Sequence, residues 1–151
     1  MAQILVPVDG SEYSTTALDV AIDLARALGA ELVILHVVDL ARAAMLSGGL
    51  AQVIPQSLAE VQAESRQIVD DARRRVPPQM RASTRLVDGI PVDQIERIAG
   101  ETMPMFVVMG THGRSGLSRA MNGSVAEGVA RRSPVPVVMV PPERHPNQAA
   151  L

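Results

Sequence analysis

The sequence predicts a single α/β domain with a doubly wound parallel sheet and helices on both faces. Short apolar runs alternate along the chain with segments in which apolar residues recur at helical spacing, and this alternation is typical of right-handed βαβ units. The run Leu32–Val38 is nearly all apolar, as expected for a parallel strand that is covered on both faces. With 151 residues, the chain is long enough for one domain with a sizeable core.

The first half of the chain predicts two strands and two helices. The apolar run Ile4–Val8 predicts a short buried strand. A helix ended by Gly29 follows, and Leu32–Val38 is the second strand. Ser57–Glu60 has the spacing of a capping box and predicts the start of the second helix. The apolar faces of these helices contain Ala17, Val20, Ala21, Leu24 and Leu28 in the first, and Leu58, Val61, Ile68, Ala72 and Val76 in the second.

The second half continues the alternation. Pro91 suits the first turn of a helix that Gly100 would end. Ser124–Glu127 again has capping-box spacing and predicts the start of the last helix. The remaining predicted strands are Ala82–Val87, Met105–Met109 and Val137–Val140.

Two segments fall outside this alternation. Asp39–Gln56 is longer than most connections in compact domains, and connections of this length are often lids, binding loops or disordered. Its apolar residues suggest that it folds onto the domain or meets a partner, but we favour a short additional helix. Residues 1–140 are then the domain itself, and residues 141–151 are a flexible C-terminal tail.

The composition excludes several classes of function. The net charge of −2 and the aromatic content of 1% argue against nucleic-acid binding. The absence of cysteine excludes thiolate nucleophiles and Cys-ligated metal sites, and the absence of lysine excludes a Walker A loop. No apolar run approaches the roughly 20 residues that span a bilayer, so we expect a soluble, cytoplasmic protein without membrane insertion.

The segment from Gly110 to Ser124 carries most of the functional information. Gly110 and Gly113 follow the fourth predicted strand, and Gly123–Ser124 precedes the last helix. Glycines let a backbone approach phosphate oxygens, and the positive end of a helix attracts anions. Arg114 could add a charge-assisted contact. The segment predicts a phosphate-binding loop, although Ser124 and Glu127 could also cap the helix without any ligand.

Asp9 supplies the second half of the predicted site. It follows the first strand, and ligands of open α/β sheets bind beyond the carboxyl ends of the strands. Its carboxylate could accept hydrogen bonds from ribose hydroxyls or hold a magnesium ion that bridges phosphates.

The glycine pattern resembles that of the universal stress protein family, in its ATP-binding branch. That branch carries two glycines separated by two residues, and nine residues later a glycine followed by serine or threonine. Gly110, Gly113, Gly123 and Ser124 match these positions. The resemblance extends over almost the whole chain, through Ile4–Ser11, Leu35–Val37, Gly89–Pro91, Gly110–Gly116, Gly123–Glu127 and Pro134–Val138.

The resemblance implies a Rossmann-like sheet of strand order 3-2-1-4-5 that binds ATP, or AMP or ADP, with Mg²⁺. It also implies a homodimer formed through the last strand, Val137–Val140. Adenine and ribose would lie against Pro7, Val8, Asp9 and Val37. Ribose and phosphates would be held by Met109, Gly110, Gly113, Gly123, Ser124 and Val125.

Two histidines need separate interpretation. His36 lies among Leu and Val in the second strand, and we expect a core histidine with a satisfied hydrogen bond. His112 lies between Gly110 and Gly113 and could approach phosphate, but a loop histidine without a special role fits as well.

We consider three functions. The first is a nucleotide-gated dimeric module in stress-response regulation that acts on an unknown protein partner. The second is a slow ATPase or nucleotidyl transferase, for which the sequence offers only Asp9, His112 and Glu127 as candidate groups. The third is a structural dimer that binds no ligand. We favour the first, with at most weak ATP hydrolysis and no assigned catalytic residue.

Overall fold

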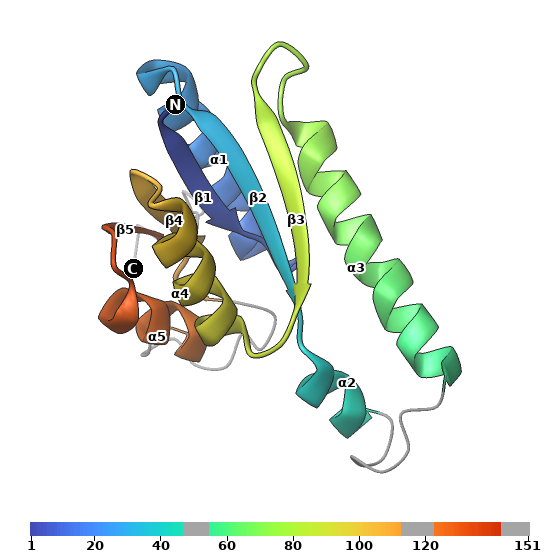
Figure 1. The fold of residues 1–151 in the computed structure, drawn as a ribbon. Coiled ribbons are helices and arrows are strands. Elements are labelled where there is room, and N and C mark those ends of the chain that lie inside the picture. Colours follow the sequence, from blue (N-terminus) through green and yellow to red (C-terminus); the bar gives the residue numbers. More distant parts are fainter. Residues whose placement is uncertain (47–54, 113–122, 143–151) are drawn as a thin grey trace, which may run out of the picture.

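The computed structural model describes residues 1–46, 55–112 and 123–142. In this part of the chain, five parallel strands form one sheet in the order β3-β2-β1-β4-β5 (Figure 1). The predicted fold class and the strand order implied by the resemblance are therefore confirmed. The strands are β1 (Gln3–Pro7), β2 (Glu31–Val38), β3 (Ala82–Asp88), β4 (Phe106–Gly110) and β5 (Val137–Val140).

Helices cover both faces of the sheet. α1 (Glu12–Leu28) and α3 (Pro55–Arg75) pack on one face, and α4 (Pro91–Thr102) and α5 (Ser124–Arg132) pack on the other (Figure 1). Each face has its own apolar core, because alternate residues of a strand point to opposite sides. In β2, Ile34 faces α1 and α3, whereas Val33 faces α4 and α5. β2 is buried along most of its length, as its apolar sequence predicted.

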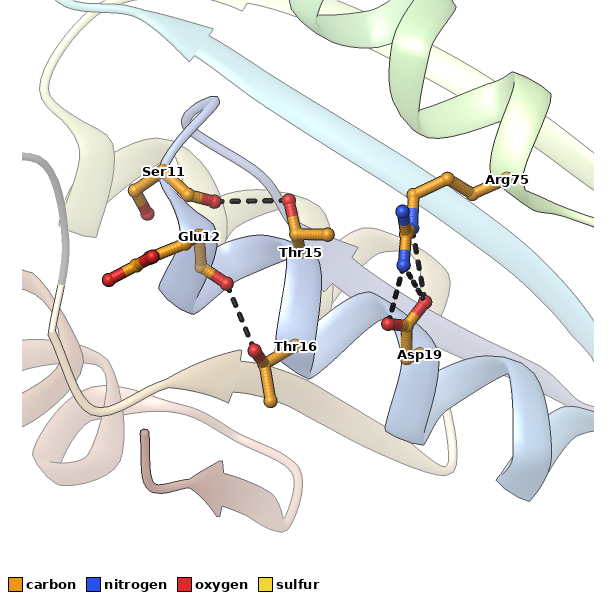
Figure 2. Close-up of polar contacts among 6 residues, drawn as sticks. All are labelled: Ser11, Glu12, Thr15, Thr16, Asp19 and Arg75. Atoms are coloured by element: carbon orange, nitrogen blue, oxygen red, sulfur yellow. Dashed lines mark hydrogen bonds and ion pairs between the residues drawn. The ribbon is translucent and has the colours of Figure 1, made fainter. Parts of the chain in front are cut away.

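An ion pair joins the two helices on the first face. The guanidinium of Arg75, at the end of α3, donates to both carboxylate oxygens of Asp19 on α1, at 2.8 and 2.6 Å (Figure 2). These hydrogen bonds raise the pKa of Arg75 above its ordinary value. Both side chains are about half exposed, so the pair adds little to the stability of the fold.

The long connection after β2 contains the expected short helix, α2 (Leu40–Leu46), which contacts α3. Residues 47–54 of this connection and residues 143–151 of the predicted tail lie outside the described residues. Within the described residues, no helix is both long and apolar enough to cross a membrane.

Two helix boundaries differ from the predictions. α3 begins at Pro55, so Ser57 lies inside the helix and does not precede it, and proline is well suited to a first helical position. α4 continues past Gly100 to Thr102, because a glycine in a helix costs stability without ending it. Met103 ends the helix in a left-handed conformation with φ of 44°, and its amide donates to the Ala99 carbonyl at 2.9 Å.

Candidate nucleotide-binding site

The predicted site lies where the chain leaves the sheet in opposite directions. β1 leads into α1 on one face, and β4, its neighbour in the sheet, leads into α5 on the other. Such a switch point is where open α/β sheets bind ligands. The register pairs β1 with β4 only at Ile4 and Leu5, whereas β1 pairs with β2 as far as Pro7.

A hydrogen-bonded turn connects β1 to α1. β1 ends at Pro7, one residue earlier than predicted, and Val8 is buried beside it. One carboxylate oxygen of Asp9 accepts from the amide of Ser11 at 2.9 Å and from its hydroxyl at 2.5 Å. Gly10 between them has φ of 82°, a left-handed conformation that favours glycine.

Ser11 is also the N-cap of α1. Its hydroxyl accepts from the Ser14 amide at 3.2 Å, and its carbonyl accepts from the hydroxyl of Thr15 at 3.1 Å (Figure 2). The hydroxyl of Ser14 in turn accepts from the Asp9 amide at 3.3 Å. The Asp9 carboxylate is therefore held by the beginning of the helix that follows it.

The ends of the second loop meet at their base. The amide of Gly123 donates to the Thr111 carbonyl at 2.5 Å, and the amide of Thr111 donates to the Val140 carbonyl at 3.1 Å. The Thr111 hydroxyl lies 2.9 Å from Nδ1 of His112. Gly123 and the end of β4 are thus brought together, as a phosphate-binding loop requires.

The start of α5 differs from the capping box that the sequence suggested. Gly123 is the N-cap, and Ser124 is the first residue of the helix. Glycine has no side chain with which to cap, and the carboxylate of Glu127 pairs with Arg131 at 2.8 Å. The interpretation of Ser124 and Glu127 as a ligand-free cap is therefore wrong. The N-cap of α5 makes no side-chain hydrogen bond, and the amides at the start of a helix attract anions.

Tyr13 lies beside the candidate site, although no motif in the sequence indicates it. Its ring lies 5.4 Å from that of His112, measured between centroids, with the planes tilted by 39°. Tyr13 is the one tyrosine of the chain and lies in the first turn of α1, two residues after Ser11. The Asp-Gly-Ser sequence signals a turn and a cap, but nothing in it signals which side chain would face His112.

The structure places most of the predicted site residues along one edge of the sheet. Pro7, Val37 and Met109 lie at or near the carboxyl ends of three adjacent strands, and Gly110 is the last residue of β4. Val125 is partly buried against the core beneath α5. Gly113 and Arg114 lie outside the described residues.

A magnesium ion at Asp9 would need ligands from elsewhere. Among residues 1–46, 55–112 and 123–142, no three side chains of His, Cys, Asp or Glu are grouped closely enough to hold a metal. Phosphate oxygens of a nucleotide are the natural source of the other ligands.

A separate hollow of about 550 Å³ opens between α1 and α3 and is also lined by Val8 and Gly10. It lies on the face of the sheet that α1 and α3 cover, opposite the face that α5 covers. Two of its polar side chains bond to each other, since Gln67 donates to Asp71 at 2.8 Å, and a third, Arg75, pairs with Asp19 outside the lining. The bond from Gln67, together with that from Arg74, lowers the pKa of Asp71 below its ordinary value. This lining is more acidic than basic, so phosphate is better received at the start of α5.

The sheet order, the switch point and the glycine-bounded start of α5 define an α/β protein of the Rossmann-like class. Within that class, the chain belongs to the universal stress protein family, whose model matches residues 1–141. It is 35% identical over 147 residues to universal stress protein YxiE of Bacillus subtilis, covering 91% of this chain and 97% of that one.

Solved structures share this fold. Hypothetical protein MJ0577 of Methanocaldococcus jannaschii has the same fold, with a TM-score of 0.82 at 24% identity over 95% of this chain and 97% of that one. A universal stress protein solved in complex with cAMP is 29% identical, with a TM-score of 0.63 over 92% of this chain and 95% of that one.

Proposed function

We propose that this chain is an adenine-nucleotide-binding module of stress-response regulation, present in the cytoplasm. The observation that carries the proposal is the start of α5 at Gly123, which is hydrogen-bonded to Thr111 directly after the carboxyl end of β4. The related structure solved with cAMP supports an adenine nucleotide as the ligand.

Different parts of the site would bind the phosphates, the base and the ribose of the nucleotide. The amides at the start of α5 and the Ser124 hydroxyl would receive phosphate oxygens, because they offer donors at the positive end of a helix dipole. The apolar side chain of Val37 would face the base, and Asp9 would accept from ribose hydroxyls. ATP with Mg²⁺ suits this division, since Asp9 could alternatively hold the ion, which would neutralise phosphate charge.

The regulatory mechanism would be a population shift. A nucleotide favours the conformation that it binds best, and a partner or the second subunit then distinguishes the loaded from the empty state. Tyr13 and His112 are placed to take part, since they connect α1 to the start of the phosphate-binding segment.

Two measurements test nucleotide binding. Purified protein should release adenine nucleotide on denaturation, and millimolar Mg-ATP should raise its melting temperature.

Gly123 has φ of −52° and ψ of 146°, which any residue adopts, so Gly123→Val adds a side chain at the phosphate position without backbone strain. Gly100→Val is the matched control, since it adds the same side chain in α4, where a Cβ would meet nothing within 4 Å. The thermal shift should therefore be lost in Gly123→Val and kept in Gly100→Val. Loss of the shift in both variants, or no shift in the natural protein, would contradict the proposal.

The dimer would form by pairing of β5, an edge strand of the sheet, with its counterpart. Because the amides of Val107 and Thr111 donate to Pro136 and Val140, the backbone groups of Val137 and Met139 face outward from the sheet. Met139→Pro removes an outward amide and leaves the bonds to β4 in place. Light scattering should give a dimer mass for the natural protein and a monomer mass for this variant, and two equal masses would exclude β5 as the interface.

A further inference from the structure

The buried side chain of His36 is bonded to the end of β1. His36 lies in β2 and is only 7% exposed, and its Nδ1 lies 2.7 Å from the carbonyl oxygen of Val8. The register that pairs Pro7 with Leu35 places His36 opposite Val8. A carbonyl oxygen can only accept, so Nδ1 must carry the hydrogen and donate it. The prediction of a core histidine with a satisfied hydrogen bond is confirmed.

This bond fixes the residue that comes immediately before Asp9. The amide of Val8 donates to the Leu35 carbonyl at 2.8 Å, and the carbonyl of Val8 accepts from His36. Both polar groups of the Val8 backbone are therefore held by β2. The pairing of β1 with β4 stops at Leu5, so β2 provides the support for β1 at this end.

The next link leads directly to the candidate site. The Val8 carbonyl belongs to the same peptide group as the Asp9 amide, which donates to Ser14. Rotation of that peptide would move the Asp9 carboxylate, which holds the start of α1 through Ser11. Holding one peptide group therefore orients the whole turn from Val8 to Ser11.

We propose that His36 is a positioning residue for nucleotide binding, which orients the turn Val8–Ser11 from behind through the Val8 carbonyl. This inference rests on the proposed function. His36 itself need not contact the nucleotide, because its effect passes through the Val8 peptide group to Asp9.

Two variants separate hydrogen-bond donation from core packing. His36→Asn keeps a side-chain N–H at the same number of bonds from Cβ, whereas His36→Leu fills the space without a donor. Isothermal titration with Mg-ATP should show binding about tenfold weaker for His36→Leu and within about threefold of the natural protein for His36→Asn. Ile34→Val is the control, because Ile34 is buried on the same face of β2 two residues earlier. It should bind within about twofold of the natural protein despite its own loss of stability.

Two spectroscopic readouts test the bond without depending on affinity. A two-bond ¹H–¹⁵N spectrum of the natural protein should show a protonated Nδ1 in His36, and an unprotonated Nδ1 would overturn the inference. The amide of Asp9 should exchange with solvent about tenfold faster in His36→Leu than in His36→Asn.

The possible outcomes are distinguishable. If the natural protein does not bind Mg-ATP, the proposed function and this inference both fail. If it binds and His36→Leu binds equally well, or if Ile34→Val or His36→Asn loses as much affinity as His36→Leu, this inference alone fails. Should His36→Leu not fold, the ring spectrum and the affinity of His36→Asn decide the question by the same criteria.

Discussion

The carbonyl oxygen of Tyr13 lies 2.9 Å from the position that a Cβ atom would take on Gly110. The end of β4 therefore approaches the first turn of α1 backbone to backbone, at the point where the Tyr13 and His112 rings also face each other. Gly110 is required here by packing, whether or not a phosphate is bound.

We expect Gly110→Ala to destabilise the protein by about 1–3 kcal/mol, because a methyl group there forces β4 and α1 apart. Urea unfolding monitored by circular dichroism would measure the change. Gly100→Ala is the matched control: a Cβ at Gly100 meets nothing within 4 Å, so alanine should stabilise α4 by about 0.5–1 kcal/mol. Equal effects of the two substitutions would contradict the close packing at Gly110.

Ser11→Ala should cost about 1 kcal/mol of unfolding free energy, because Ser11 caps α1 through the Ser14 amide. The same change removes the hydroxyl that donates to Asp9. Thr16→Ala removes a hydroxyl that donates to the Glu12 carbonyl on the exposed side of the same helix (Figure 2). That control should stay within about 0.5 kcal/mol of the natural protein. If the Ser11 cap contributed nothing, Ser11→Ala and Thr16→Ala would have the same unfolding free energy.

The Asp19–Arg75 pair should show a coupling energy of about 0.5–1 kcal/mol in a double-mutant cycle of Asp19→Ala and Arg75→Ala. Both side chains are about half exposed, which limits the coupling to the range of surface pairs. Because the pKa of Arg75 is raised, the contribution of the ion pair to the free energy of unfolding is complete at neutral pH. It is lost only as the pH rises through the raised pKa of Arg75. The coupling should fall in 1 M salt, and a coupling that ignores salt would rule out an electrostatic origin.

The existence and type of the elements could be predicted from the sequence, because hydrophobic periodicity is a local signal. Helix ends were harder where they depend on backbone geometry. Gly29 ends α1, as predicted, and adopts a left-handed conformation. Met103 adopts the same kind of conformation at the end of α4 although it carries a side chain. A residue type indicates which backbone conformations cost little free energy. The path of the chain toward β4 decides at which residue α4 ends in the left-handed conformation.

The site was predictable only in part, for a related reason. Motif spacing indicated Asp9, Gly110, Gly123 and Ser124, since these belong to loops that follow strands or precede a helix. Tyr13 and His112 are 99 positions apart in the sequence, so their contact depends on how α1 packs against β4. The distinction between Ser124 as a cap and Ser124 as the first helical residue depends on one residue of register, which spacing alone does not determine.

Ser124 offers the most direct test of that distinction. Since Gly123 is the N-cap and Ser124 the first helical residue, Ser124→Ala should change the unfolding free energy by no more than about 0.5 kcal/mol. A capping serine would instead cost about 1 kcal/mol. If the hydroxyl donates to a phosphate oxygen, the same substitution should weaken Mg-ATP binding by about tenfold, the loss expected for a hydrogen bond to a charged group.

Ser133 provides the reciprocal control at the other end of the same helix. Its hydroxyl donates to the Val135 carbonyl at 2.7 Å and accepts from the Val135 amide at 3.2 Å, so it joins the end of α5 to the segment before β5. Ser133→Ala should therefore lower stability and leave Mg-ATP affinity unchanged, the opposite of Ser124→Ala. Titration calorimetry and urea unfolding on the two variants separate the roles. A Ser124→Ala variant that loses stability but keeps its affinity would return Ser124 to an ordinary helix-capping role, because the hydroxyl would then serve the fold and not the ligand.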